Sequence, residues 1–149
     1  MNLISVTDIK HKISSVGLKA TSQRIAIYQA VMKLKNHPTV EMILEEISPL
    51  HPSISVGTLY KNLETLVEVS LLEKVKSEEG NYRFEANLDK HNHIYCSNTK
   101  EIIDYQDDEL DLILFEYFKK KKLKNLKIND IRLQISAERL NINKEISIQ

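Results

Sequence analysis

The sequence predicts an α+β protein in which a winged helix-turn-helix precedes a small α/β domain. Four segments with apolar residues at helical spacing lead directly into two short alternating segments that fit a β-hairpin. A brief polar stretch follows, and after it come two further strand patterns, a helix and a last strand. We therefore place the winged helix in residues 1–86, a hinge at 87–90 and the second domain at 91–149.

Each of the first four helices is expected to begin at a hydroxyl side chain that caps the exposed N–H groups of its first turn. The expected N-caps are Thr7, Thr21 or Ser22, Thr39 and Ser55. The helices cover residues 5–16, about 21–34, about 39–48 and 55–70. Gly17 ends the first, and Pro49 and Pro52 end the third. Apolar positions expected inside include Met42, Ile43, Leu44 and Ile47 in the third helix and Val56, Leu59, Leu63, Leu66 and Val67 in the fourth.

The strand patterns follow in two groups. Residues 72–76 and 82–86 alternate around a turn that contains Gly80, which predicts the hairpin. Strands are then expected at 93–97 and 101–105, a helix at 107–122 and a final strand at 124–137 with a bulge at Asn129 and Asp130. The helix is expected to bury Leu110, Ile113, Leu114, Tyr117 and Phe118. A three-stranded sheet leaves exposed edges, so we expect a two-fold dimer to cover them.

Composition sets limits on function. The 149 residues contain 21 Lys and Arg against 21 Asp and Glu, so any contact with nucleic acid must come from local placement of charge. No apolar stretch is long enough to span a membrane and no secretory leader is evident, so a cytoplasmic protein without a membrane partner is expected. The single cysteine, Cys96, excludes an internal disulfide and a cysteine-based zinc site within one chain.

The fourth helix has a polar face suited to the major groove. Thr58, Lys61, Asn62 and Thr65 lie on one side of it, and the helix leads straight into the predicted wing. An ordinary solvated helix face is the alternative for the helix alone. The order of helix and hairpin favours DNA binding.

A metal site is indicated by His91 and His93. In an extended segment, side chains two residues apart share one face, so both imidazoles are able to reach one ion. Two solvent-facing histidines are the alternative.

Several motifs, taken in order, resemble the ferric uptake regulator family of bacterial metal-dependent repressors over nearly the whole chain. The matching segments are residues 17–24 (GLKATSQR), 36–39 (NHPT), 55–63 (SVGTLYKNL), 83–85 (RFE), 91–96 (HNHIYC) and 101–105 (EIIDY). The resemblance implies a homodimeric repressor, not an enzyme, that binds an AT-rich palindromic operator in double-stranded DNA. Tyr60 would contact the major groove and Lys19 the minor groove, with Arg24, Thr58, Lys61 and Asn62 in the same DNA-binding set.

The resemblance also implies that one regulatory ion is bound by His37, Glu85, His91, His93 and Asp104. Nitrogen and oxygen donors suit Fe(II) or Mn(II), and Zn(II) is possible in purified protein. The ion would link the winged-helix domain to the second domain and so set the DNA-binding conformation. For Glu85 or Asp104 considered alone, the alternative to a metal ligand is an ordinary acidic residue on the surface.

Departures from the family pattern refine these expectations. Residues 96–99 (CSNT) keep only the first cysteine of a C-x-x-C pair, so the family's structural zinc, which is held by two such pairs, is expected to be absent. Within the family, Asp at the position of Asp104 resembles peroxide sensors, in which Fe(II) and peroxide would oxidise His37 or His91. Peroxide sensors usually have Asp at the position of Glu85 as well, so Glu85 resembles the alternative, an iron-responsive repressor. A haem-responsive relative and a non-haem iron enzyme with two histidines and a carboxylate are further alternatives.

Overall fold

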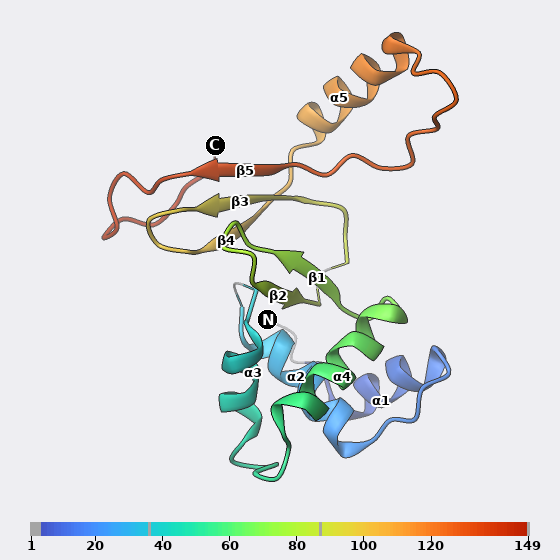
Figure 1. Ribbon diagram of the computed structural model, residues 1–149, viewed down its shortest axis with the longest axis vertical. Coiled ribbons are helices and arrows are strands. Elements are labelled where there is room, and N and C mark those ends of the chain that lie inside the picture. The colour runs from blue at the N-terminus through green and yellow to red at the C-terminus, as the bar shows by residue number, and fades with distance from the viewer. Residues whose placement is uncertain (1–3, 36, 87, 149) are drawn as a thin grey trace. The chain divides into compact units, whose positions relative to one another are not determined.

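The computed structural model describes residues 4–35, 37–86 and 88–148. The chain divides into two compact units, residues 1–88 and 89–149, called here the N-terminal and C-terminal units. Figure 1 labels their helices and strands. Asn36, in the motif at 36–39, and Asn87, at the start of the predicted hinge, lie outside the described residues.

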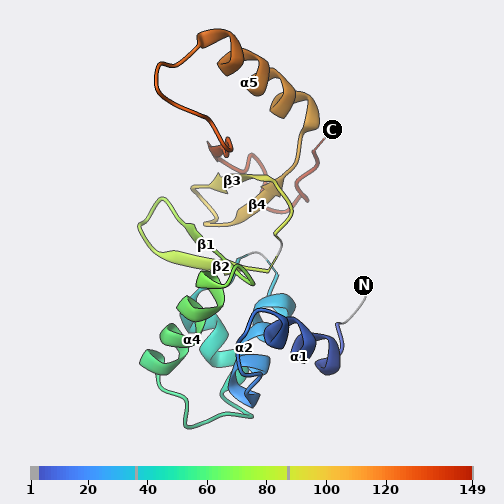
Figure 2. The same ribbon diagram turned by 90° about the vertical axis from the view of Figure 1, so that its right-hand side faces the viewer.

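The N-terminal unit is a winged helix-turn-helix, as predicted. Its helices lie together beneath a two-stranded hairpin (Figure 2). The elements are α1 (Val6–Ser15), α2 (Ser22–Lys33), α3 (Val40–Ile47), α4 (Val56–Glu68), β1 (Glu73–Lys76) and β2 (Tyr82–Glu85).

Local side-chain chemistry fixes where these helices begin. Thr21, Thr39 and Ser55 are the N-caps of α2, α3 and α4, which confirms the predictions. The expected cap of α1 was wrong, because Ser5 and not Thr7 accepts a hydrogen bond from the Asp8 amide, at 3.1 Å. The Ser5 hydroxyl also donates to the Asp8 carboxylate at 2.7 Å, and this reciprocal pairing three residues apart selects the earlier start.

The core of this unit lies among its four helices, and Phe84 of the wing joins it. Its buried residues include Ile9, Ile13, Ile27, Tyr28, Ile43, Ile47, Leu59, Leu63, Leu66 and Phe84. Two expected core positions, Met42 and Val56, are exposed instead. In α3 the buried stripe is Val40, Ile43 and Ile47, and Met42 falls outside that narrower face. Val56 is the first residue of α4 and precedes its buried stripe.

The wing is an antiparallel hairpin, as predicted. Glu73 pairs with Glu85 and Lys76 with Tyr82, and Gly80 adopts the left-handed backbone with φ +85° in the turn. The Ser77 amide donates to the Asn81 carbonyl at 2.8 Å, which closes the loop. The hairpin therefore has a short, well-defined turn.

The C-terminal unit is a three-stranded sheet with one helix. Its elements are β3 (Asn92–Cys96), β4 (Ile102–Tyr105), α5 (Asp108–Lys121) and β5 (Gln134–Ala137). The strand order is β4-β3-β5, with β3 antiparallel to β4 and parallel to β5. The first two strands and the helix match the predictions to within one residue at each boundary.

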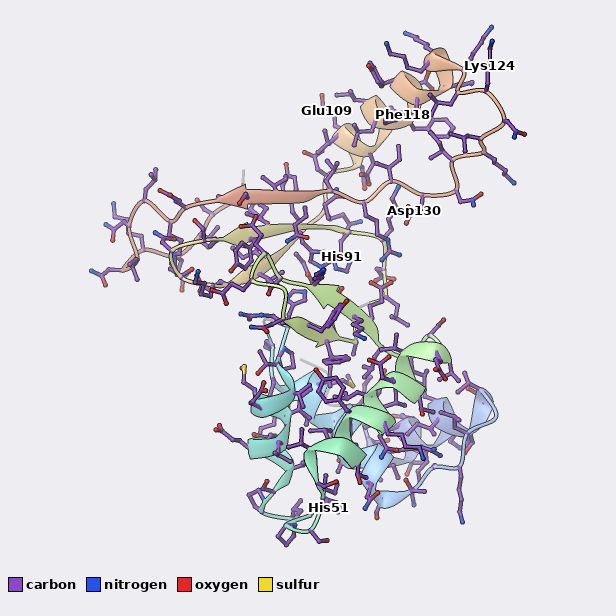
Figure 3. All side chains as sticks on the ribbon, in the orientation of Figure 1. His51, His91, Glu109, Phe118, Lys124 and Asp130 are labelled. Atoms are coloured by element: carbon purple, nitrogen blue, oxygen red, sulfur yellow. The ribbon has the colours of Figure 1, made fainter. Side chains whose placement is uncertain are left out.

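The last predicted strand is much shorter than expected. Only residues 134–137 of the predicted 124–137 form a strand. The reason lies at Asp130, whose carboxylate accepts hydrogen bonds from the Ile131 amide at 3.0 Å and from Arg132 Nε at 2.8 Å. Such local bonds compete with a strand ladder. Figure 3 shows Asp130 on the irregular segment between α5 and β5.

Helix α5 is exposed along much of its apolar surface. No residue of it is buried, and Ile113 and Tyr117, which were predicted inside, are 57% and 51% exposed. Leu112 and Phe115 are also exposed, at 61% and 60%. The amphipathic pattern therefore identified apolar positions that a single chain does not cover. No helix in the described parts of the chain is long and apolar enough to cross a membrane.

Candidate metal centre and nucleic-acid interface

Three potential metal ligands converge in the C-terminal unit. His93 on β3 lies directly opposite Asp104 on β4, and His91 precedes β3 by one residue on the same face. The Nε2 atoms of His91 and His93 are 3.0 Å apart. Asp104 Oδ1 is 3.3 Å from the first of them and 3.5 Å from the second. These three residues are called here the triad.

The spacing of the triad matches the coordination shell of a divalent ion. Metal bonds of about 2.0–2.2 Å at octahedral to tetrahedral angles separate neighbouring ligand atoms by about 3.0–3.5 Å. The three observed separations fall within that range. Two imidazoles and a carboxylate are ligands that Fe(II), Mn(II) and Zn(II) accept.

A backbone contact orients His91. Its Nδ1 lies 2.5 Å from the carbonyl oxygen of Asp89. Because a carbonyl oxygen only accepts, Nδ1 is the protonated nitrogen and the lone pair belongs to Nε2, which faces the other ligands. The contribution of Asp89 could not be predicted from the sequence, since a main-chain carbonyl leaves no signal in residue identity.

The remaining two predicted ligands form a pair in the N-terminal unit. His37 Nε2 lies 2.7 Å from Glu85 Oε2, and both side chains are only 5% exposed. The Phe84 amide donates to the Pro38 carbonyl at 3.1 Å, which joins β2 to the segment between α2 and α3. His37 has φ 62°, a left-handed conformation that is uncommon for a residue with a side chain and that often marks a binding site.

Each unit thus brings its own share of the predicted ligands together. His91, His93 and Asp104 meet in one unit, and His37 and Glu85 meet in the other. That all five bind one ion stays a prediction. Cys96 is a buried free thiol on β3 and belongs to neither group.

Helix α4 presents some of the predicted DNA-binding residues to solvent. Tyr60 and Lys61 are exposed, whereas Thr58 and Asn62 are half-buried. Asn62 Nδ2 donates to the Thr58 carbonyl at 3.0 Å, and the Thr58 hydroxyl accepts from the Ser55 hydroxyl at 3.0 Å. Thr58 and Asn62 therefore have partners within the helix, and Tyr60 and Lys61 extend from its surface.

The connection between α1 and α2 carries Lys19, and Arg24 lies just beyond it on α2. Lys19 is exposed and Arg24 is half-buried. Arg24 Nη1 donates to the Lys19 carbonyl at 2.9 Å. These two predicted DNA-binding residues are consequently in contact, with different exposure.

The wing contributes a further positive charge beside α4. Lys74 Nζ lies 2.5 Å from Glu64 Oε1 and 4.2 Å from the centre of the Tyr82 ring. The hydrogen bond to Glu64 raises the pKa of Lys74, with Coulombic attraction to the same carboxylate adding to it. Lys74 therefore remains charged at neutral pH, although Glu64 balances that charge.

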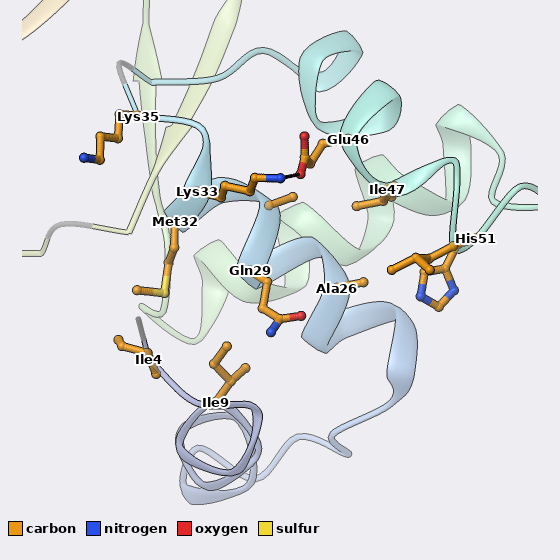
Figure 4. Close-up of a pocket in the computed structure, with 12 residues that line it drawn as sticks. Ile4, Ile9, Ala26, Gln29, Met32, Lys33, Lys35, Glu46, Ile47 and His51 are labelled. Carbon is orange, nitrogen blue, oxygen red and sulfur yellow. Dashed lines mark hydrogen bonds and ion pairs between the residues drawn. The ribbon is translucent and has the colours of Figure 1, made fainter. Parts of the chain in front are cut away.

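A cavity of about 540 Å³ lies in the N-terminal unit, away from the predicted sites (Figure 4). Its walls come from the segment before α1, from α1, α2 and α3, and from the loop after α3. They include Ile4, Ile9, Met32, Ile47 and Leu50. The ion pair between Lys33 and Glu46 lies on its rim. None of the predicted metal or DNA-binding residues lines it.

Comparisons with known proteins agree with the fold. Residues 15–136 match the model of the ferric uptake regulator family. The peroxide-responsive repressor PerR of Staphylococcus aureus is 29% identical over 117 residues, which span 74% of this chain and 79% of the relative.

Two solved structures extend the comparison of the fold. The ferric uptake regulator Fur of Helicobacter pylori, described as having three functional metal binding sites, superimposes with a TM-score of 0.79, 20% identity and coverage of 99% of both chains. The peroxide stress regulator of Campylobacter jejuni gives a TM-score of 0.67, 24% identity and coverage of 95% of this chain and 99% of that one.

Proposed function

Because the chain belongs to the ferric uptake regulator family of metal-responsive transcription regulators, we propose that it is a dimeric repressor that senses hydrogen peroxide through a bound Fe(II) or Mn(II) ion. Proteins of this family are regulators that bind DNA as dimers, so the alternative of a non-haem iron enzyme is set aside. The observation that carries the proposal is the triad, whose three ligand atoms have the separations of a coordination shell.

The regulatory ion is proposed to take ligands from both units. The triad supplies three donors and the pair of His37 and Glu85 supplies two. Three donors leave open positions at a divalent ion, and the buried pair is of the right chemical type to fill two of them. All five ligands are nitrogen or oxygen, which fits Fe(II), Mn(II) and Zn(II). One ion per subunit is expected, without a structural zinc held by four cysteines, because Cys96 is the only cysteine.

The consequence for DNA binding is a change in how freely the units move. Ligands on both sides of the connection near residue 88 would hold the units in one arrangement when they share an ion. Moving such an equilibrium from 1:99 to 99:1 needs about 5.5 kcal/mol of differential affinity. A pair of additional metal ligands supplies energy of that order, since structural metal sites contribute about 10–16 kcal/mol in total.

The DNA contacts are proposed to come from α4 and from the connection before α2. Tyr60 and Lys61 are exposed and suited to the major groove, and Lys19 is an exposed cation suited to the minor groove. Thr58 and Asn62 are proposed to assist close to the backbone of α4, where they already have partners. An AT-rich palindrome is the expected operator for a two-fold dimer.

The dimer is proposed to form through the C-terminal unit. There the apolar residues of α5 are uncovered in a single chain, and β5 is an edge strand of its sheet. A second copy would cover both by two-fold symmetry. The proposed role of this unit is therefore dimerisation together with metal sensing.

Peroxide is proposed as the signal because position 104 holds Asp, the residue that the family resemblance associates with peroxide sensors, and because the PerR of Staphylococcus aureus is a relative. Bound Fe(II) would supply the one-electron chemistry that activates peroxide, and the imidazoles of His37 and His91 are the ligand groups proposed to be oxidised. Glu85 favours the second candidate, an iron-responsive repressor in which the same ligands bind Fe(II) reversibly.

The first experiment measures operator binding by fluorescence anisotropy with an AT-rich palindromic duplex, with and without Mn(II). We expect Mn(II) to strengthen binding and His93→Ala to abolish that response. His11→Ala is the matched control, because His11 is an exposed histidine of α1 outside both ligand groups. Equal affinity with and without metal would contradict the proposal of a metal-dependent repressor.

The second experiment separates the two signals. Mass spectrometry of Fe(II)-loaded protein after treatment with peroxide is expected to show oxygen added to the peptide with His37 or His91, and the Mn(II)-loaded protein serves as the control. No added oxygen on either peptide, together with release from DNA by chelation alone, would reject peroxide sensing and favour the iron-responsive candidate.

A further inference from the structure

The connection between α1 and α2 is fixed by hydrogen bonds at both ends, and the side chain of Lys19 extends from it. Helix α1 is followed by Gly17, where φ is +82°, and the Leu18 amide donates to the Ile13 carbonyl at 3.3 Å. Helix α2 begins at the N-cap Thr21, whose hydroxyl accepts from the Arg24 amide at 3.2 Å. Between these ends, Leu18 and Ala20 pack against the core. Lys19, which lies between them, is exposed.

The backbone of Lys19 is held at its carbonyl oxygen by two donors. The Thr21 amide donates to it at 3.0 Å, and Arg24 Nη1 donates to it at 2.9 Å. The second bond carries a full positive charge and is therefore stronger than a neutral one. Arg24 stands on the first turn of α2, so it links the connection to the rigid part of the unit.

The Arg24 side chain is packed and only half-exposed. Its Nε is enclosed, without a hydrogen-bond partner among the described residues. A guanidinium that binds a phosphate in bidentate fashion uses two parallel N–H donors of its planar fork. Here one nitrogen is enclosed and another is bound to the main chain, which leaves a smaller part of the group accessible.

We infer that Arg24 is a positioning residue, which acts on DNA through Lys19 by fixing the main chain from which the lysine extends. The inference rests on the proposed function, in which Lys19 contacts the minor groove. A side chain that is already anchored loses less freedom when it enters a groove. Without the bond from Arg24 the connection must be ordered on binding, and we expect affinity to fall about two- to tenfold.

The test is a double-mutant cycle on the Mn(II)-loaded protein of 149 residues. Operator affinity is measured by fluorescence anisotropy at several salt concentrations for Lys19→Ala, Arg24→Gln and the double variant. We expect each single substitution to weaken binding, and Arg24→Gln to have no further effect on affinity or on salt dependence when Lys19 is already alanine. The inference is overturned if the losses of binding free energy in the two single variants add up in the double variant, and if the slope of log affinity against log salt concentration decreases in magnitude by about a further 0.9. That result would identify a direct contact of Arg24 with a phosphate.

Two variants serve as controls for charge and folding. Arg24→Lys keeps the charge but lacks the planar fork, so a positioning role predicts that it loses affinity, whereas a purely electrostatic role predicts that it retains affinity. It also replaces Arg24→Gln if the latter does not fold, as judged by circular dichroism. Lys10→Gln, at an exposed position of α1, measures the effect of removing one positive charge from the unit.

The outcomes also separate this inference from the function on which it rests. If Lys19→Ala leaves affinity unchanged while Mn(II) still promotes binding, the metal-dependent repressor stands and the positioning role falls. If the unmodified protein does not bind the operator with Mn(II), the proposed function itself fails.

Discussion

A clamp made by Asn98 holds the segment after β5 against the turn between β3 and β4. Its Nδ2 donates to the Arg139 carbonyl at 2.9 Å, and its Oδ1 accepts from the Arg139 amide at 3.0 Å. One side-chain amide thus satisfies both main-chain groups of a residue 41 positions away in the sequence. This turn contains the residues that depart from the C-x-x-C pattern.

The cost of removing the clamp follows from these two bonds. A neutral hydrogen bond contributes about 0.5–1.5 kcal/mol, so two contribute about 1–3 kcal/mol. Asn98 is exposed, and its bonds compete with water, so we expect Asn98→Ala to lower the free energy of unfolding by about 1–1.5 kcal/mol. With a slope of about 2 kcal/mol per molar urea, the midpoint decreases by about 0.5–0.75 M.

The assay is urea unfolding followed by circular dichroism at a fixed protein concentration. Asn129→Ala is the matched control, since Asn129 is an exposed asparagine of the same unit whose side chain has no hydrogen bond in the described structure. Its midpoint is expected to stay within about 0.2 M of the unmodified protein, which corresponds to a change below about 0.5 kcal/mol. Equal midpoints for both variants would refute the assigned role of Asn98.

Three further predictions concern stability and assembly. The hydrogen bond from Thr99, followed by the bonds and charge of Arg139, lowers the pKa of Glu101. The ionised Glu101 therefore stabilises the fold above its unfolded-state pKa, and this stabilisation is lost as the pH falls through the lower folded-state pKa. Between about pH 7 and pH 3, the urea midpoint of Glu101→Gln should consequently decrease less than that of the unmodified protein. Leu63→Ala, at a fully buried position of α4, should cost about 2–5 kcal/mol in urea unfolding, whereas Met42→Ala, at an exposed position, should cost well under that. Chelation should leave the dimer intact in sedimentation, because the chain lacks the cysteines for a structural zinc, and a chelated sample that sediments as monomer would contradict this expectation.

The N-terminal unit was predictable because its signals are local. A hydroxyl at the N-cap reaches an amide only three residues away, so Thr21, Thr39 and Ser55 reveal helix starts without knowledge of the fold. The same rule gave the wrong residue at α1, where Thr7 was predicted and Ser5 is the N-cap. The acidic partner at Asp8 decides between them.

The C-terminal unit was harder to predict because its apolar residues have less to pack against within the chain. The pattern at 124–133 alternates as a strand would, yet the carboxylate of Asp130 binds the adjacent backbone and no ladder forms there. In α5 the periodicity located the apolar residues correctly but carried no information on what covers them. A hydrophobic pattern shows which side chains avoid water, but it does not show which surface they pack against.

The predicted metal ligands also differ in how far local sequence signals locate them. Two-residue spacing on a strand was enough to bring His91 and His93 to one face, and strand pairing then placed Asp104 opposite. No spacing rule joins His37 to Glu85, because their contact depends on a main-chain bond between Phe84 and Pro38 that forms only when β2 packs beside the segment before α3. Local strand geometry therefore brings three of the ligands together, and tertiary packing brings together the other two. Since the two sets stand on different compact units, loss of any triad residue is expected to weaken metal binding without disturbing the His37–Glu85 pair.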